Sequence, residues 1–188
     1  AEPERVLRIG IDVQANELIT TGSNDRAHLV FLDGTSVTVG PNAQLSIDKF
    51  VYDPNTKTGE LAVSASKGVL RLVGGKISKT PPITITTPSS TIGIRGGITI
   101  VEAQPTHTVS TFVFGDKLTS TAQGQTTTVV RPGFRVITNA GSPPGAATAV
   151  RPGELSNSMS QLEGGKSGGQ SSGGGSSGGA GGAAAGGS

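Results

Sequence analysis

The sequence predicts a single all-β domain of roughly ten to thirteen short strands, folded as a β-roll, a solenoid-like stack or a sandwich. Apolar and polar residues alternate over short runs, and Gly, Pro, Asn and Asp separate these runs. No segment shows helical periodicity over three turns. With five Phe, one Tyr and no Trp, the core must be aliphatic, as is typical of packed sheets.

The first third of the chain predicts strands at residues 5–11, 17–22, 27–32 and 35–39. Asp33 and Gly34 stand between the last two runs. Asp-Gly favours a two-residue hairpin turn of type I′, because both central positions of that turn need positive φ. We therefore expect a tight hairpin whose turn is Asp33-Gly34.

The middle of the chain continues this pattern. Residues 44–52 and 60–66 alternate, with Leu61, Val63 and Ala65 facing inward, and residues 69–73 form a nearly continuous apolar run that contains Arg71. Gly68 is expected to interrupt the chain between the last two strands, because glycine weakens a strand interior. Another alternating strand is predicted at residues 83–87.

The stretch 89–101 is the focal point of the predicted fold. It places Arg95 between alternating isoleucines and follows it with Gly96 and Gly97, a pattern that predicts a strand ending in a tight turn or bulge. Two interpretations of Arg95 remain open. In one, a semi-buried guanidinium is paired with backbone carbonyls or a carboxylate and serves as the structural pin of the bend. In the other, Arg95 is presented to a partner's carboxylate or phosphate.

The last part of the domain predicts strands at residues 108–114, 117–121, 126–131 and 134–138. We expect the domain to span residues 1–155 and a short helix to follow at residues 156–163. Residues 164–188 contain 13 of the chain's 30 glycines, a composition typical of a flexible linker or tail.

The net charge of +2 conceals an asymmetry. Residues 1–60 carry five Lys or Arg against nine Asp or Glu, whereas residues 61–101 carry five basic residues and no acidic one. Lys67, Arg71, Lys76 and Lys79 therefore form a candidate basic strip for an anionic glycan or lipid. No aromatic residues interleave with it, so a nucleic-acid partner is not expected.

The residues argue against an enzyme. There is no cysteine, and neither His28 nor His107 has a second ligand at metal-binding spacing. No nucleophile elbow, phosphate-cradling loop or dinucleotide fingerprint occurs. We expect no catalytic residues, no cofactor and no metal.

Residues 10–115 resemble the FecR domain family in an ordered set of short motifs. These motifs are Ile19 to Gly22, Phe31 to Thr35, Val39 to Asn42, Ile47 to Asp53, Lys67 to Lys76, Thr86 to Pro88 and Ile92 to Gly96. The family's pattern continues Arg-Gly-Thr, and this chain has Gly97 in the place of the threonine.

The resemblance implies a non-enzymatic, extracytoplasmic module that binds protein partners at the bacterial envelope, in the periplasm, at the cell surface or as a secreted protein. The best-known members contact an outer-membrane transporter and control a sigma factor through a membrane span. No such span occurs in this sequence, so a free-standing or secreted member is the closer match. Two alternatives remain open: a self-assembling subunit of an extracellular filament or surface layer, and binding of an anionic envelope glycan or lipid through the basic strip.

Overall fold

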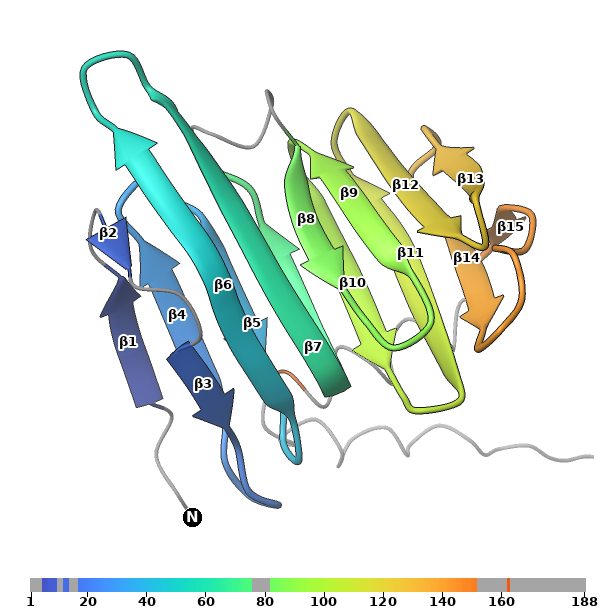
Figure 1. The fold of residues 1–188 in the computed structure, drawn as a ribbon, viewed down its shortest axis with the longest axis horizontal. Coiled ribbons are helices and arrows are strands. Elements are labelled where there is room, and N and C mark those ends of the chain that lie inside the picture. Colours follow the sequence, from blue (N-terminus) through green and yellow to red (C-terminus); the bar gives the residue numbers. More distant parts are fainter. Residues whose placement is uncertain (1–4, 10–11, 14–16, 76–81, 152–161, 163–188) are drawn as a thin grey trace, which may run out of the picture.

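A computed structural model describes residues 5–9, 12–13, 17–75, 82–151 and 162. Within these residues the chain forms fifteen strands, and each belongs to one of two sheets that share a single strand, β7 (Figure 1). Two of the fifteen, β2 (Asp12–Val13) and β15 (Thr148–Ala149), are only two residues long, which leaves thirteen longer strands. The prediction of an all-β domain is confirmed, and the strands form one continuous sheet that curls at β7 into two layers.

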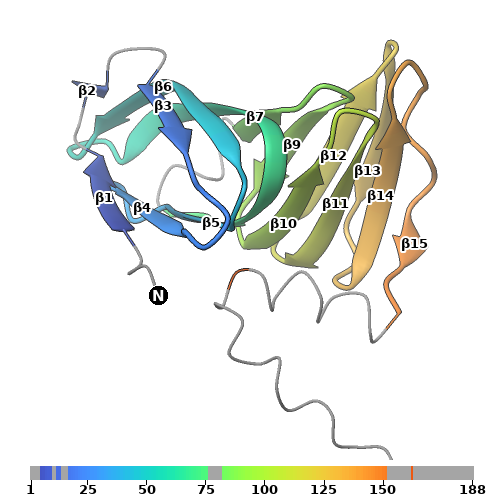
Figure 2. The same cartoon turned by 90° about the horizontal axis from the view of Figure 1, so that it is seen from below.

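Sheet A contains, in order across the sheet, β1 (Arg5–Ile9), β4 (Ala27–Phe31), β5 (Ser36–Val39), the second half of β7 (Thr58–Val73), β10 (Ile98–Ala103), β11 (His107–Phe114), β14 (Phe134–Asn139) and β15. Sheet B begins with β2 and β3 (Glu17–Thr20), which both pair with β6 (Gln44–Asp53). It continues through the first half of β7 to β8 (Ile83–Thr86), β9 (Thr91–Arg95), β12 (Lys117–Ala122) and β13 (Gln125–Val129). Figure 2 shows the two layers meeting along β7.

The continuous strand β7 corrects the prediction of two separate strands at residues 60–66 and 69–73. Its first half pairs with β6 in sheet B, and from Gly68 onward it pairs with β10 in sheet A. Gly68 has φ of 111°, and a Cβ at this position would lie 2.3 Å from the Cβ of Ala43. Glycine therefore bends the strand from one sheet into the other instead of ending it.

The core lies between the sheets and is largely aliphatic, as the composition predicts. Leu61, Val63 and Ala65 of β7 face inward, each 1% exposed. The rings of Phe31 and Phe50 pack with their centroids 4.9 Å apart. Toward β12 and β14 the interior becomes polar, where hydroxyl groups join the two sheets.

Two hydrogen-bonded hydroxyl contacts cross this polar part of the interior. Thr87 Oγ1 lies 2.7 Å from Thr108 Oγ1, and Ser120 Oγ of β12 lies 3.1 Å from Thr138 Oγ1 of β14. Ser120 is also hydrogen-bonded to Ser90. Buried hydroxyls that are paired in this way avoid the cost of unsatisfied polar groups, so they can replace apolar packing.

Asp33-Gly34 forms the predicted hairpin, but the turn type differs from the expectation. Phe31 and Thr35 are hydrogen-bonded across the turn, so the loop has three residues, and only Gly34 of these has positive φ. This is the three-residue loop in which a type I turn is followed by a left-handed glycine. Asp33 turns its carboxylate inward and accepts hydrogen bonds from the amide and the hydroxyl of Thr35, which stabilises this loop.

Candidate interaction site

The Arg95-Gly96-Gly97 segment lies where the chain crosses from sheet B to sheet A. β9 ends at Arg95, and β10 begins at Ile98. Gly96 and Gly97 have φ of 67° and 84°, and the carbonyl of Gly97 accepts a hydrogen bond from the amide of Gly74 at 2.8 Å. The predicted tight bend is present, and it links the two sheets beside the end of β7.

Gly97 has no room for a side chain. A Cβ there would lie 1.9 Å from the carbonyl oxygen of Phe114 and 2.3 Å from Cα of Gly115. Gly115, with φ of 135°, is equally crowded, because its Cβ would lie 2.3 Å from the oxygen of Gly96. A threonine side chain would not fit on this backbone. Gly97 replaces the threonine of the family's pattern at a point where two backbone segments are in direct contact.

This contact coincides with a β-bulge between β10 and β11. Ile98 pairs with Phe114 and Thr99 with Phe112, so that Val113 is the extra residue. A bulge bends its strand and increases the local twist. The three glycines therefore fix both the crossing between the sheets and the direction of the neighbouring strand.

Arg95 is exposed, and its side chain makes no hydrogen bond or ion pair with any described residue. The semi-buried, paired guanidinium is not what the structure shows. Ile92 and Ile94 are fully buried, and strand alternation turns Arg95 to the opposite, solvent-facing side of sheet B. The glycines, and not Arg95, hold the bend, while the role of Arg95 as an interaction residue stays a prediction.

Lys117 is the neighbour that sequence reasoning missed. It pairs in register with Arg95 across β9 and β12, and it too has no ion pair within the described part of the chain. Two cations directly opposite each other on adjacent strands repel. We call Arg95 and Lys117 the cationic pair. No local motif reveals it, because the register of two strands 22 residues apart is decided by the tertiary fold.

The cationic pair is chemically suited to bind an anion. A guanidinium offers a planar fork of donors and an ammonium offers a mobile point charge, so together they can hold one carboxylate or phosphate. Asp116 lies next to the pair in sequence, and its amide donates to the carbonyl of Arg95 at 3.1 Å. This bond fixes the backbone of the two cationic positions relative to each other.

The candidate basic strip is described only in part. Lys67 is exposed and Arg71 is half-buried, and the bend at Gly68 lies between them. Lys76 and Lys79 lie outside the described residues. The strip as a binding surface therefore stays a prediction.

The Asp33-Gly34 turn is tied to the end of β7. Asp33 is 1% exposed, and its carboxylate accepts hydrogen bonds from the Thr35 amide at 3.1 Å and the Thr35 hydroxyl at 2.7 Å. The same hydroxyl oxygen accepts a bond from the Gly75 amide at 3.0 Å. This network makes the turn a structural element, and the sequence did not indicate that Gly75 would contact Thr35.

The two histidines lie apart from each other in hydroxyl-rich surroundings. Nδ1 of His28 is 3.0 Å from Thr38 Oγ1, and Nδ1 of His107 is 3.1 Å from Thr106 Oγ1. The described residues contain no group of three or more His, Cys, Asp or Glu side chains that could hold a metal ion. They also contain no helix with the length and apolar character needed to cross a bilayer.

The fold is similar to that of solved structures. Two crystal structures of a candidate anti-sigma factor from Parabacteroides distasonis ATCC 8503 superpose with TM-scores of 0.59 and 0.57, at 13% and 11% sequence identity. The alignments cover 77% and 76% of this chain and, in both cases, 64% of the solved chain, so this chain spans less than two thirds of its structural relatives. At such low identity, the likeness shows the fold.

A comparison with curated protein sequences gave no significant match. The model of the FecR protein family, in contrast, matches residues 17–116, which is just over half of the chain. The matched region runs from β3 to the turn before β12 and includes the shared strand, both glycine bends and Arg95. The chain belongs to the FecR family.

Proposed function

We propose that this chain is a non-enzymatic regulatory module that binds a protein partner outside the cytoplasm, at the bacterial cell envelope. Membership of the FecR family and the fold it shares with a candidate anti-sigma factor support a signalling role. A scaffold role at the envelope would use the same kind of contact. Both roles require a surface that a partner can recognise.

The observation that carries the proposal is the cationic pair. Arg95 is exposed and Lys117 half-buried, and no described carboxylate forms an ion pair with either. Elsewhere on sheet B a comparable charge is neutralised, since Lys49 and Glu60 form a salt bridge of 2.9 Å. An acidic side chain of a partner would attract both cations and would also relieve the repulsion between them. Both effects favour its binding.

Site-specific photo-crosslinking in the source bacterium tests this proposal. A photoreactive residue at the exposed Asp116, beside the intact cationic pair, should capture one defined protein, whereas the same residue at Thr126, exposed on edge strand β13, should not. Arg95→Met combined with Lys117→Met, with the crosslinker at the neighbouring Asp116, should reduce capture at least tenfold. Equal capture at positions 116 and 126, or capture at position 116 that survives both substitutions, would reject the cationic pair as the contact.

The extracytoplasmic location is tested separately with the complete gene. A fusion to a phosphatase that folds only in oxidising compartments should be active, and a fusion to a reporter that works only in the cytoplasm should be inactive. The opposite pattern would reject the envelope location without deciding the role of Arg95.

The two alternatives stay predictions. Filament assembly would use an open sheet edge such as β13, which has β12 as its partner. It predicts assemblies visible by negative-stain microscopy, and a monomer at high concentration would contradict it. Glycan or lipid binding through the basic strip predicts salt-sensitive pull-down on envelope preparations.

A further inference from the structure

The cationic pair has an apolar neighbour on the same face of sheet B. Val129 is 2% exposed, whereas the next residue, Val130, is 61% exposed, so strand alternation turns Val130 to the outer side. Leu118 pairs in register with Val129, and one position further along the ladder Lys117 lies opposite Val130. Arg95, Lys117 and Val130 therefore form a row across β9, β12 and the end of β13, which we call the corner row.

The surface next to the corner row is low and uncharged. In the adjacent row of sheet B, Thr119 pairs with Gly93 on one side and with Thr128 on the other. A Cβ at Gly93 would lie 2.7 Å from Thr119 Oγ1, so the threonine hydroxyl lies against the glycine backbone. Side chains this short leave the longer Arg95 and Lys117 within reach of a ligand that lies on the face.

Asp116 is the acidic residue beside the corner row, and it does not neutralise the cations. Its carboxylate lies on the side of the Gly96 bend, since a Cβ at Gly96 would be 3.5 Å from Asp116 Oδ2. It forms no ion pair within the described part of the chain. The charge of the cationic pair is therefore available to a carboxylate from outside.

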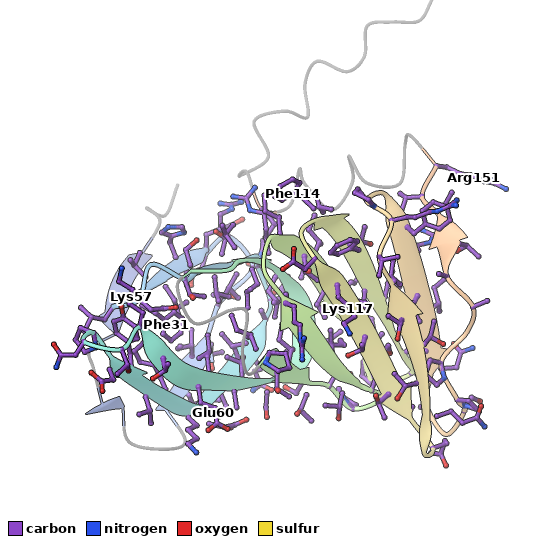
Figure 3. All side chains as sticks on the ribbon, turned by 90° about the horizontal axis from the view of Figure 1, so that it is seen from above. Phe31, Lys57, Glu60, Phe114, Lys117 and Arg151 are labelled. Carbon is purple, nitrogen blue, oxygen red and sulfur yellow. The ribbon has the colours of Figure 1, made fainter. Side chains whose placement is uncertain are left out.

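The exposed aromatic side chain at this end of the molecule does not belong to the corner row. Phe114 is 62% exposed, but Figure 3 shows it on the outer side of sheet A, apart from Lys117. The apolar contact beside the cationic pair is therefore Val130, which offers room for an aliphatic side chain of a ligand.

The dimensions of the corner row select the shape of the ligand. Neighbouring strands lie about 4.8 Å apart, so the midpoint between Arg95 and Lys117 is about 7 Å from Val130. In an extended peptide, residues i and i+2 point to the same side and are about 6.5–7 Å apart. A peptide that crosses the strands can therefore place a carboxylate over the pair and, two residues away, an aliphatic side chain over Val130.

We propose that the partner presents an extended acidic segment to the corner row, in which an Asp or Glu stands two residues from a Leu, Ile or Val. This inference rests on the proposed function, because it specifies what the cationic pair binds. The guanidinium and the ammonium share the carboxylate, and the aliphatic side chain covers Val130 and excludes water beside the ion pair. The residue between them points away from the sheet, so its identity is free to vary.

Fluorescence anisotropy of labelled peptides, titrated with the full chain, tests this spacing. Two peptides have the same composition and the same Ser and Thr flanks but differ in order, Glu-Thr-Leu against Glu-Leu-Thr. The first should bind about fivefold more tightly, because only its leucine reaches Val130 when the carboxylate lies over the pair. It should also bind about tenfold more tightly than an uncharged Gln-Thr-Leu peptide, and added salt should reduce this difference.

Variants of the chain separate the apolar contact from the charges. Val130→Ser should remove the preference for Glu-Thr-Leu over Glu-Leu-Thr. Leu32→Ser, at a side chain that is 50% exposed beside the Asp33-Gly34 turn, is the matched control and should leave the preference unchanged. Arg95→Met combined with Lys117→Met should weaken both acidic peptides about tenfold.

Each contrary result identifies which part of the proposal is wrong. Equal binding of the two acidic peptides, with both weakened by loss of the cationic pair, would reject the spacing and leave the proposed function standing. Failure of both peptides to bind, while a partner is still captured at position 116, would reject the acidic segment alone. Binding that is unchanged without Arg95 and Lys117 would reject the cationic pair itself. Vesicles of phosphatidylglycerol that bind through Val130 and the pair, with no preference between the peptides, would assign the corner row to a lipid surface.

Discussion

At the scale of single residues, the fold depends on positions where a side chain is excluded or a hydroxyl is shared. Gly97 belongs to the first kind, because its Cα faces the backbone of Phe114 and Gly115 directly. Thr35 belongs to the second kind, because one hydroxyl serves both Asp33 and Gly75. Each position can be tested against a residue of the same type that lacks the feature.

Gly97→Ala should lower the free energy of unfolding by about 3 kcal/mol. The left-handed backbone costs alanine about 1–2 kcal/mol, and the close contact with Phe114 adds about 1–3 kcal/mol. Gly124→Ala is the matched control, because Gly124 has φ of 73° but a Cβ added to it would meet no atom within 4 Å. Chemical denaturation measures both. Equal losses for the two variants would mean that the contact at Gly97 relaxes freely.

Thr35→Val should destabilise the protein by about 2–3 kcal/mol, because a buried Asp33 carboxylate and the Gly75 amide each lose a hydrogen-bond partner. Thr121→Val, which removes an exposed hydroxyl contact with Thr126, should change stability by less than about 0.5 kcal/mol. Thermal unfolding followed by circular dichroism compares them. Similar melting temperatures for the two variants would contradict a structural role for the Asp33 network.

At the scale of elements, the sequence predicted the strands well and their connections less well. Alternation is a local signal, and it located β4, β5, β8 and β11 within two residues. A glycine in an alternating run is ambiguous, because either a break or a bend produces the same pattern. At Gly68 the structure has a bend, and the evidence for it is the contact with Ala43, which lies 25 residues earlier.

The bend at Gly68 predicts a specific pair of effects. Gly68→Ala should cost about 2–4 kcal/mol, since its Cβ would approach the Cβ of Ala43 to 2.3 Å at positive φ. Adding Ala43→Gly removes the colliding methyl group and should restore about 1 kcal/mol or more of this loss. A double-mutant cycle measured in urea gives the coupling. A coupling of zero would show that strain at positive φ, and not the contact, accounts for the loss.

The candidate site illustrates the same limit of the sequence. The bend at Gly96-Gly97 could be predicted from two glycines after a strand. The exposure of Arg95 could also have been predicted. Side chains alternate along a strand, and the apolar Ile92 and Ile94 face inward, so Arg95 faces solvent. Its neighbour Lys117 could not, because only the register of β9 with β12 brings them together. The helix predicted at residues 156–163 lies, except for the helical Leu162, outside the described residues.

At the scale of the whole molecule, the two sheets should unfold together because they share β7. Leu61 lies in the sheet B half of this strand and Leu72 in the sheet A half, and both are buried. Leu61→Ala and Leu72→Ala should each cost about 2–5 kcal/mol. Both should shift one cooperative transition without changing its denaturant dependence.

Two probes report on this cooperativity. Tyr52, the one tyrosine of the chain, lies on β6 in sheet B, and its fluorescence follows that sheet. Circular dichroism follows the strands of both sheets. The two curves should coincide in the parent and in both variants. A Leu72→Ala variant in which the dichroism changes before the fluorescence would show that sheet A unfolds independently.

The position of β7 also determines how long its amide protons are retained. Residues 62–64 have strand neighbours on both sides, β6 and β8, and so do residues 70–73, with β5 and β10. Amides in such doubly flanked stretches exchange with deuterium only when the molecule opens globally, whereas edge strands exchange through local fraying. Mass-spectrometric exchange should therefore find the last protium in these two stretches of β7, with β13 labelled first; early labelling of residues 70–73 would refute this order.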